Sequence, residues 1–248
     1  MYVNRQKSGI VKKFWLLYNI TMTRGIFIVG NESALSRAIE AEAERRVDRF
    51  AAALIPNRLT GALVTNTVLK SSSGKDEKRM YLDWNPSSPI SARTLILGAE
   101  NRLDRIDEAI LVCSPPSVRC SAAELPLADA EILVNDHIKG WFFLIKELAA
   151  VFSSRKSGIL ALVYHDVPPA KKDDIADILG PTALASFRAI TQGLLTAAHN
   201  EPYITVGFSC SDAGNEDAFS AFVFKSIDEV NGRSNGKLYK YGKLNLFR

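Results

Sequence analysis

Residues 131–165 constrain the fold more than any other part of the chain, because they join an apolar helix directly to an apolar strand. Their sequence is EILVNDHIKGWFFLIKELAAVFSSRKSGILALVYH. We predict a helix over 131–152, a polar turn over 153–158 and a strand over 159–163. A strand without polar alternation must be covered on both faces, as strands are in the parallel sheets of α/β proteins. The stretch therefore predicts a parallel sheet between two layers of helices.

The rest of the chain continues this alternation of strands and helices. Further strands are predicted over 25–29, 51–55, 80–82, 110–113 and 203–208, with a last one within 237–246. Helices are predicted from Ala34 with Ser33 as N-cap, from Ser91, over 183–199 and over 215–230. Residues 62–70 fit either a helix or a strand, and 71–78 fit a loop. This order predicts an α/β, Rossmann-like, doubly wound and mainly parallel sheet in three layers, α/β/α.

Residues 1–22 read as an extension that precedes a single domain over 23–248. The apolar run 14–18 is shorter than the roughly 7–15 residues of a signal-peptide core or the roughly 20 residues of a membrane span. We expect a disordered arm or a start codon assigned too early, because Met22 immediately precedes the first strand. An interfacial basic and aromatic anchor is the less favoured alternative.

Charge and cysteine content exclude several classes of function. The net charge of +4 comes from 31 basic and 27 acidic residues that are scattered along the chain, which gives no support to nucleic-acid binding. The three cysteines Cys113, Cys120 and Cys210 lack the paired spacing of a metal site, and an odd number does not suit a disulfide framework. We expect a cytoplasmic protein with no membrane partner and no nucleic-acid partner.

The first strand, turn and helix have the order of a unit that holds phosphates in other proteins. Such a turn needs glycines so that the backbone can bend tightly and approach a pyrophosphate. Only Gly30 is present, and Ala34 and Ser36 stand where later glycines would be wanted. The second strand ends without the carboxylate that grips a ribose, whereas Arg58 could meet a 2′-phosphate or simply be a solvated charge.

Four segments together resemble the short-chain dehydrogenase/reductase family, from about residue 23 to the end of the chain. They are RIDEAILV at 105–112, YLD at 81–83, DHIKGWF at 136–142, and SFRA at 186–189 with the Gly-Leu that follows at 193–194. The resemblance implies that 105–112 enters the fourth strand and that Asp83 lies near an adenine. It also implies that 136–142 begins the central helix, and that 186–194 belongs to the helix that carries the family's Tyr-x-x-x-Lys pair.

The resemblance implies degenerate cofactor-binding positions. Gly30 is what is left of the glycine-rich turn, and Cys113-Ser114-Pro115-Pro116 stands where the family has Asn-Asn-Ala-Gly. The positions implied for cofactor binding are Gly30, Arg58, Asp83 and Cys113. NAD(P) is the cofactor that the resemblance implies, and the loss of glycines predicts that it binds weakly or not at all.

The resemblance implies an equally altered catalytic site. His137 stands at the position of the active-site Asn, and Tyr164 and His165 stand where the active-site Ser is expected. The Tyr position falls on Leu184 and the Lys position on Arg188. A leucine cannot donate a proton to a carbonyl, so the family's general acid is lost.

The first hypothesis for function is therefore a protein without the family's usual catalysis, retained as a binding or assembly scaffold. The resemblance implies a homodimer or homotetramer through helices 137–152 and 184–199. The first of these helices is apolar around nearly its whole circumference, which requires burial on all sides. The alternative for that helix is burial within one subunit.

Two other hypotheses stay open. One is a divergent NAD(P)-dependent oxidoreductase acting on a small carbonyl or alcohol substrate, in which His137, Tyr164 and His165 form a replacement acid–base cluster with Arg188 nearby. The other is a small-molecule sensor without turnover. A metal site of His137 and His165 lacks a third ligand, so no metal is expected.

Overall fold

The structure is a computed structural model that describes residues 24–46, 49–55, 58–59, 79–166, 177–212 and 214–242. The predictions for 1–22, 62–70 and 71–78 lie outside these residues, as do most of the loop before the second long helix and the end of the last predicted strand.

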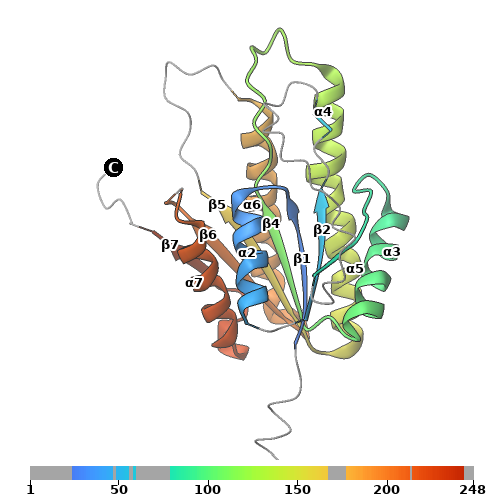
Figure 1. Cartoon of the computed structure of the whole chain (residues 1–248), viewed down its shortest axis with the longest axis vertical. Coiled ribbons are helices and arrows are strands. Elements are labelled where there is room, and N and C mark those ends of the chain that lie inside the picture. Colours follow the sequence, from blue (N-terminus) through green and yellow to red (C-terminus); the bar gives the residue numbers. More distant parts are fainter. Residues whose placement is uncertain are drawn as a thin grey trace, which may run out of the picture.

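A seven-stranded parallel sheet forms the centre of the molecule, in the order β3-β2-β1-β4-β5-β6-β7 (Figure 1). Every strand pairs with its neighbours in parallel. The strands are β1 (Gly25–Asn31), β2 (Arg49–Ile55), β3 (Arg79–Tyr81), β4 (Glu108–Cys113), β5 (Ile159–His165), β6 (Ile204–Cys210) and β7 (Leu238–Tyr241). The predicted Rossmann-like fold is confirmed, and the chain reverses direction along the sheet between β3 and β4, which places β1 beside β4.

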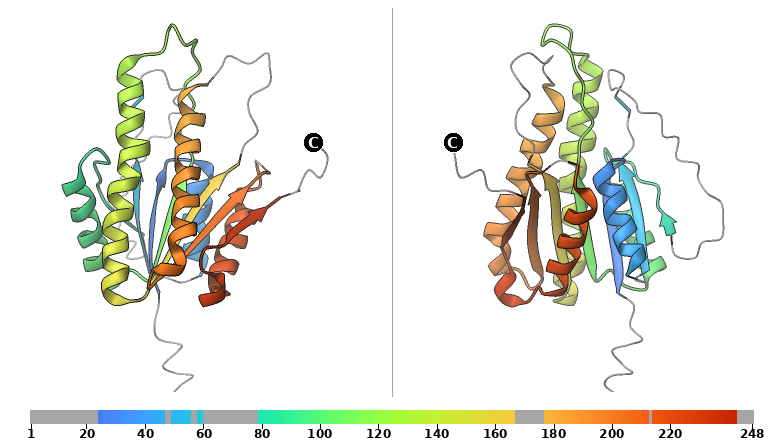
Figure 2. Two further views of the ribbon diagram at one scale, coloured as in Figure 1. Left: turned by 180° about the vertical axis from the view of Figure 1, so that it is seen from behind. Right: turned by 60° about the vertical axis from the view of Figure 1, so that its left-hand side comes forward.

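Helices cover both faces of the sheet (Figure 2). They are α2 (Ala34–Arg45), α3 (Pro89–Leu103), α4 (Leu127–Val134), α5 (Gly140–Arg155), α6 (Leu179–Ala197) and α7 (Glu216–Asp228). One apolar core lies between the sheet and α3, α5 and α6, and a second lies between the sheet and α2 and α7. Strands β1 and β4 are buried along their whole length, which explains why their sequences show no polar alternation. None of the described helices is both long and apolar enough to cross a membrane.

The stretch that constrained the fold has the predicted order of helix, turn and strand, but its helix is longer and irregular. The predicted span of 131–152 is α4, then a π-helical turn, η1 (Asn135–Lys139), then α5 as far as Arg155. The helix ends at Lys156, which has a left-handed backbone with φ of 54°, and the chain then turns through Gly158 into β5. The pattern of apolar residues in the sequence does not distinguish a π-turn from an α-helix, so this irregularity was not predicted.

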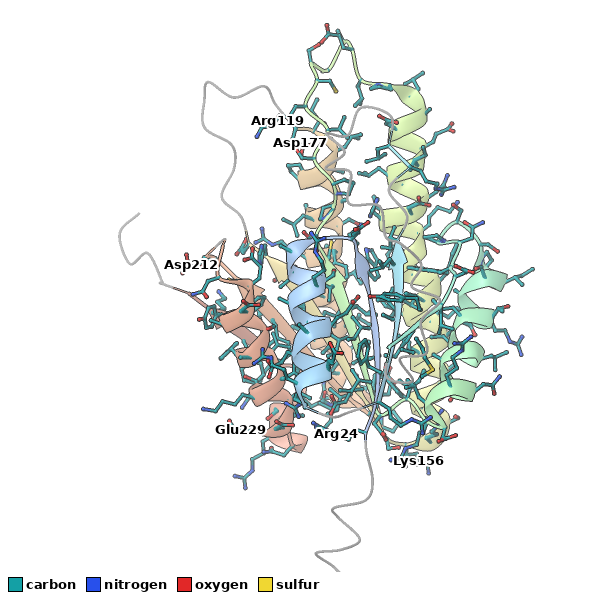
Figure 3. The ribbon with its side chains drawn as sticks, viewed as in Figure 1. Arg24, Arg119, Lys156, Asp177, Asp212 and Glu229 are labelled. Atoms are coloured by element: carbon teal, nitrogen blue, oxygen red, sulfur yellow. The ribbon has the colours of Figure 1, made fainter. Side chains whose placement is uncertain are left out.

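A third apolar cluster lies beyond the carboxyl edge of the sheet. Its buried members are Leu59, Val118, Leu133, Leu179 and Ala183. They join α4 and the first turns of α6, which both extend past the strands (Figure 1). An antiparallel bridge between Arg119 and Asp177 lies in the same region (Figure 3). The cluster therefore covers the edge at which parallel α/β proteins bind ligands.

The start of α5 approaches the loop after β3 very closely. A Cβ atom at Gly140 would lie 2.7 Å from Cβ and 3.3 Å from the carbonyl oxygen of Pro86. Only glycine allows the helix to pack at this distance, because Pro86 is buried and its ring is rigid.

We predict that Gly140→Ala lowers the free energy of unfolding by about 1–3 kcal/mol, since the new methyl group overpacks this contact. Gly193→Ala is the matched control in α6, where no described atom lies within 4 Å of the position of the added Cβ. Alanine favours a helix, so this control should raise stability by about 0.5–1 kcal/mol. Urea denaturation checks both variants, and equal effects would contradict the close packing.

Candidate functional site

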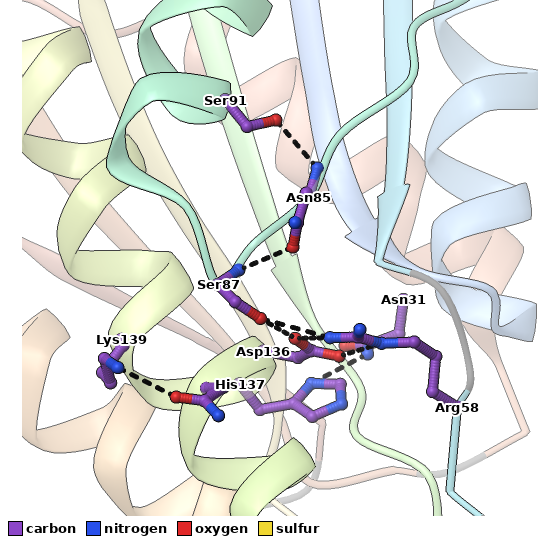
Figure 4. Close-up of polar contacts among 9 residues, drawn as sticks. Asn31, Arg58, Asn85, Ser87, Ser91, Asp136, His137 and Lys139 are labelled. Carbon is purple, nitrogen blue, oxygen red and sulfur yellow. Dashed lines mark hydrogen bonds and ion pairs between the residues drawn. The ribbon is translucent and has the colours of Figure 1, made fainter.

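The polar side chains that could carry a function meet at the carboxyl edge of β1, β2 and β4 (Figure 4). Asn31 ends β1, Arg58 follows β2, and Ser114 follows β4. Asp136 and His137 reach the same place from the π-turn η1. Open α/β sheets bind ligands in the crevice outside the carboxyl ends of their strands, so this is the place to expect a site.

The π-turn buries two polar neighbours in sequence. Asp136 has an exposed fraction of 0% and His137 of 1%. Consecutive residues of an α-helix point about 100° apart, so a regular helix would not easily aim both at polar partners. An extra residue in the turn changes this spacing locally, and π-turns are frequent at functional sites. Here Asp136 faces Arg58 and Ser87, while His137 faces Asn31.

The carboxylate of Asp136 accepts three hydrogen bonds, two from the guanidinium of Arg58 and one from the hydroxyl of Ser87. Arg58 donates from Nε to Oδ2 at 3.0 Å and from Nη2 to Oδ1. The Ser87 hydroxyl donates to Oδ1 at 3.1 Å. A fork-like guanidinium matches both oxygens of a carboxylate, which makes this a strong type of ion pair. The guanidinium that sequence suggested for a 2′-phosphate is thus engaged within the protein.

The contacts of Asn31 determine the protonation of His137. The Ser114 backbone N–H donates to Asn31 Oδ1 at 3.3 Å, so the amide nitrogen of Asn31 must face His137. That nitrogen lies 3.1 Å from His137 Nδ1. Since Asn31 donates there, Nδ1 is the acceptor and the ring proton is on Nε2. Burial lowers the pKa of His137 to about 4, with Asp136 opposing and Arg58 adding to that change, so the ring is neutral at pH 7.

The turn after β1 is closed by its own side chains. Ser33 accepts a hydrogen bond from the Ser36 backbone N–H at 3.1 Å, which confirms it as the N-cap of α2. The Ser33 hydroxyl also donates to Ser36 Oγ at 3.2 Å. Ser36 Oγ lies 2.7 Å from the position that a Cβ would take on Gly30. A hydroxyl therefore fills the space beside the one glycine of the turn.

The cavity that the described residues leave at this edge is small. The cavity measures about 160 Å³ and is lined by Asn31, Glu32, Ser33, Ile55, Ser114, Pro115, Pro116 and His137. Pockets for ligands of drug size measure roughly 300–1,000 Å³. This cavity by itself is therefore too small to enclose NAD(P). Pro115 and Pro116, where the family has small residues, form one wall of the cavity.

Tyr164 and Arg188 lie together on the other side of this edge. The Tyr164 ring is 6.2 Å from that of Phe187 in α6. Burial raises the pKa of Tyr164, and hydrogen bonds with Ser209 and Arg188 oppose that rise. Arg188 also forms an ion pair with Asp166 at 3.0 Å. The tyrosine at the end of β5 thus meets the arginine that stands at the family's lysine position.

The structure does not gather His137, Tyr164 and His165 into one cluster. Successive side chains of a strand point to opposite faces, so His165 faces α7 while Tyr164 faces α6. The His165 ring lies 6.0 Å from that of Phe219, and burial lowers its pKa while Glu216 opposes this. A joint acid–base cluster required all three residues in one pocket, whereas His165 lies on the opposite face of the sheet from Tyr164.

The remaining predicted positions carry no visible site chemistry. Cys113 is buried at the end of β4, and burial raises the pKa of its thiol. Asp83 is exposed after β3 and does not belong to the cavity lining. No group of three metal-ligating side chains exists among the described residues.

Sequence reasoning missed three polar residues of the candidate site: Asn31, Ser87 and Asp136. Asp136 gave a usable signal, because an acidic residue within an apolar helix must be exposed or paired. Asn31 gave a weaker signal, because it is the polar last residue of an otherwise apolar strand. Nothing local indicated that Ser87 would bond to a residue 49 positions away.

The chain was compared with known families, curated proteins and solved structures, and only the solved structures show similarity. No family model and no curated protein matches the sequence. A short-chain dehydrogenase from Bacillus anthracis is similar over 91% of this chain and 99% of its own, with TM-score 0.68 and 12% identity. The chain has the short-chain dehydrogenase fold. Serine dehydrogenase from Escherichia coli covers 88% of this chain and 96% of its own, with TM-score 0.63 and 13% identity.

A third similar structure, the NADH-dependent reductase A1-R′, was solved as a complex with NAD. It covers 88% of this chain and 94% of its own, with TM-score 0.64 and 13% identity. The resemblance that the sequence suggested is confirmed at the level of the fold. Identities this low say nothing about the chemistry of the site.

The lowered pKa of His137 makes stability depend on pH. The folded protein keeps the ring neutral down to about pH 4, whereas an unfolded chain binds a proton below about pH 6.5. Below about pH 6.5 the unfolded chain gains a proton that the folded protein does not take up, which favours unfolding. The free energy of unfolding is therefore highest above pH 6.5 and falls as pH decreases toward 4. Lowering the pH from 7 to 5 should cost the wild type about 2 kcal/mol through this group alone.

We predict that His137→Gln removes this part of the loss, measured by urea unfolding at both pH values. The exposed His199→Gln is the matched control and should lose stability as the wild type does. An identical loss in all three proteins would contradict the buried neutral state of His137.

Proposed function

We propose that this protein is a non-catalytic member of the short-chain dehydrogenase type, retained as a scaffold for binding or assembly. One observation carries the proposal. At the carboxyl edge of the sheet the protein makes its own contacts, Asn31 with His137 and Arg58 with Asp136, and the cavity that the described residues leave beside them measures about 160 Å³. A hydride-transfer enzyme of this fold needs that edge for a dinucleotide.

The replacement of the proton donor supports the same conclusion. Leu184, which stands at the family's tyrosine position, packs against the apolar core between the sheet and α5. Arg188 stands at the lysine position and pairs with Asp166. A leucine side chain has no proton that it can donate to a carbonyl. The guanidinium of Arg188 is paired with the carboxylate of Asp166.

We propose that NAD(P) binds weakly or not at all. The reductase A1-R′ shows that a protein of this fold can hold NAD, at 13% identity to this chain. In this chain, Ser36 Oγ lies beside the one glycine of the turn after β1, and Pro115 and Pro116 line the cavity at the same edge.

We further propose that the protein assembles with copies of itself in the cytoplasm, through helices 137–152 and 184–199. Trp141, Leu144 and Leu148 of α5 face the sheet and are buried. Phe142 is 54% exposed and Leu127 81% exposed on the outer face of the same long helix. Large apolar side chains on one helix face favour a symmetric contact with a second subunit.

The meeting of Tyr164 and Arg188 favours a second candidate, a divergent oxidoreductase acting on a small carbonyl or alcohol. A cation beside a phenol favours its ionised form, which is what the family's lysine does for its tyrosine. The same experiment distinguishes the two candidates, because the oxidoreductase must bind a dinucleotide.

Dinucleotide binding is tested by titrating the protein with NADH and with NADPH. Two of the three tryptophans, Trp84 and Trp141, are buried near the site with ring centroids 6.3 Å apart, so their fluorescence should respond to a bound nicotinamide. We expect no saturable quenching and no rise in melting temperature up to about 1 mM of either nucleotide. Saturable binding with oxidation of NADH by a small ketone or aldehyde would establish the oxidoreductase.

Self-assembly is tested by sedimentation velocity at micromolar concentration. We expect a dimer or tetramer, with Phe142→Glu shifting the protein toward monomer, since a charge in an apolar interface is costly. Lys225→Glu, at an exposed position of α7 on the opposite side of the sheet, is the matched control and should sediment like the wild type. A monomeric wild type would overturn the assembly proposal.

A further inference from the structure

A second cavity, much larger than the one at the carboxyl edge, lies at the amino edge of the sheet. It measures about 940 Å³, and small-molecule sites measure roughly 300–1,000 Å³. The first residues of four strands line it: Arg49 of β2, Glu108 of β4, Ile159 of β5 and Ile204 of β6. Arg24 and Lys156 line it as well, and Figure 3 labels both at the lower end of the molecule. We call this cavity the amino-edge groove.

The amino-edge groove is elongated, because it follows the edge of the sheet from one strand to the next. In the order of the sheet, β2 and β6 are four strand spacings apart. At about 4.8 Å for each spacing, the first residues of these two strands are roughly 19 Å apart. A molecule that fills the groove is therefore longer than it is wide.

The two ends of the groove differ in polarity. At β5 and β6 the lining consists of Ile159, Pro202, Tyr203 and Ile204. Ile159 and Ile204 are only partly buried, so their side chains present apolar surface there. At β1, β2 and β4 the lining is charged. Such a groove favours an amphipathic ligand, with its apolar body at β5 and β6 and its polar head nearer to β4.

The charges of the lining leave one cation without an acidic partner. Each of the four acidic side chains is paired with arginine: Glu108 with Arg24, Asp228 with Arg24 and Arg46, Asp104 with Arg49, and Asp107 with Arg105. Lys156 is the remaining basic residue of the lining, and it forms no ion pair with any described residue. A negatively charged head group would therefore gain an ion pair at Lys156.

The fold keeps Lys156 at the groove. It follows the last turn of α5 and precedes Ile159 by three residues, so it lies where the apolar part of the lining begins. Its backbone is left-handed, with φ of 54°, and its N–H donates to the carbonyl groups of Phe152 and Ser153. A non-glycine residue in this conformation is uncommon. The helix end thus holds the lysine beside the strand starts.

We infer that the amino-edge groove binds a small amphipathic anion, an elongated molecule with an apolar body and one negatively charged group that pairs with Lys156. The groove lies at the other end of the strands from the candidate site. The inference therefore goes beyond the proposed function and does not depend on it.

The test is NMR of the full chain labelled with ¹³C in its isoleucine δ1 methyl groups, titrated with monomeric decanoate. Ile159 and Ile204 report on the groove. Ile55 at the carboxyl-edge cavity and the exposed Ile90 of α3 are internal controls. We expect saturable shifts of the first two methyl groups and no shift of the other two.

Decanol and decylamine have the same chain with a neutral and a positive head. The carbonyl ends of α3, α5 and α7 face the amino edge and carry partial negative charge, which attracts cations. Decylamine is therefore the strictest comparison for an anion site. We expect decanoate to bind most tightly, decanol more weakly and decylamine most weakly.

Lys156→Asn removes the cation, and asparagine tolerates the left-handed backbone at this position. Decanoate should bind this variant about two- to fivefold more weakly, as expected for the loss of a partly exposed ion pair. The affinity for decanol should stay the same. Lys240→Asn, at an exposed position of β7 outside the groove lining, is the matched control and should bind decanoate as the wild type does.

Several results would overturn the inference. They are the absence of a saturable decanoate shift at Ile159 and Ile204, tighter binding of decylamine than of decanoate, and an equal loss of decanoate and decanol affinity in Lys156→Asn.

Sedimentation with phosphatidylglycerol vesicles distinguishes a free anion from a membrane surface. We expect the wild type to stay in the supernatant. Sedimentation with the vesicles that Lys156→Asn abolishes would show that the groove meets a lipid head group, and would overturn its assignment to a free molecule.

Discussion

The buried carboxylate of Asp136 is the interaction on which the arrangement of the site depends. A carboxylate with an exposed fraction of 0% needs a charged partner and further hydrogen bonds, because removing it from water is otherwise too costly. Arg58 and Ser87 supply them. The three side chains tie together the π-turn of the long helix, the segment after β2 and the loop after β3 (Figure 4). Breaking the pair would leave an uncompensated charge inside the molecule.

The same π-turn has a second consequence, one residue further along. With Asp136 held toward Arg58, His137 points at the end of β1 and accepts from Asn31. Asn31 is in turn oriented by the Ser114 backbone N–H. Residues that follow three different strands are thereby bonded to one helix across the ligand edge of the sheet. These contacts across the edge, rather than any single lost catalytic residue, are the main support for the proposal that the fold is kept without the family's usual catalysis.

The fold was predictable because its signals are local. Fully apolar strands such as β4 and β5 require a covered parallel sheet, and the order of strands and helices leaves few topologies. The opposite directions of Tyr164 and His165 were also within reach of sequence, since neighbours in a strand face opposite ways. Applying that rule would have separated His165 from the site at once.

The rest of the site could not be predicted, because its contacts join distant parts of the chain. Arg58 and Asp136 are 78 residues apart, and Asn31 and His137 are 106 apart. Periodicity indicated that 131–152 is helical, but a π-turn differs from an α-helix by one residue and leaves no trace in an apolar pattern. Arg58 was interpreted as a phosphate contact because it follows a strand. Its actual partner, Asp136, is too distant in the sequence to be recognised from the local pattern.

The most direct test of a closed ligand edge is a crystal structure from crystals grown with saturating NADH. We predict that Asn31 stays bonded to His137, that Ser36 stays against Gly30, and that no dinucleotide density lies between the turn after β1 and Pro115. Density for a pyrophosphate over Gly30, with Ser36 or the prolines displaced, would contradict the account.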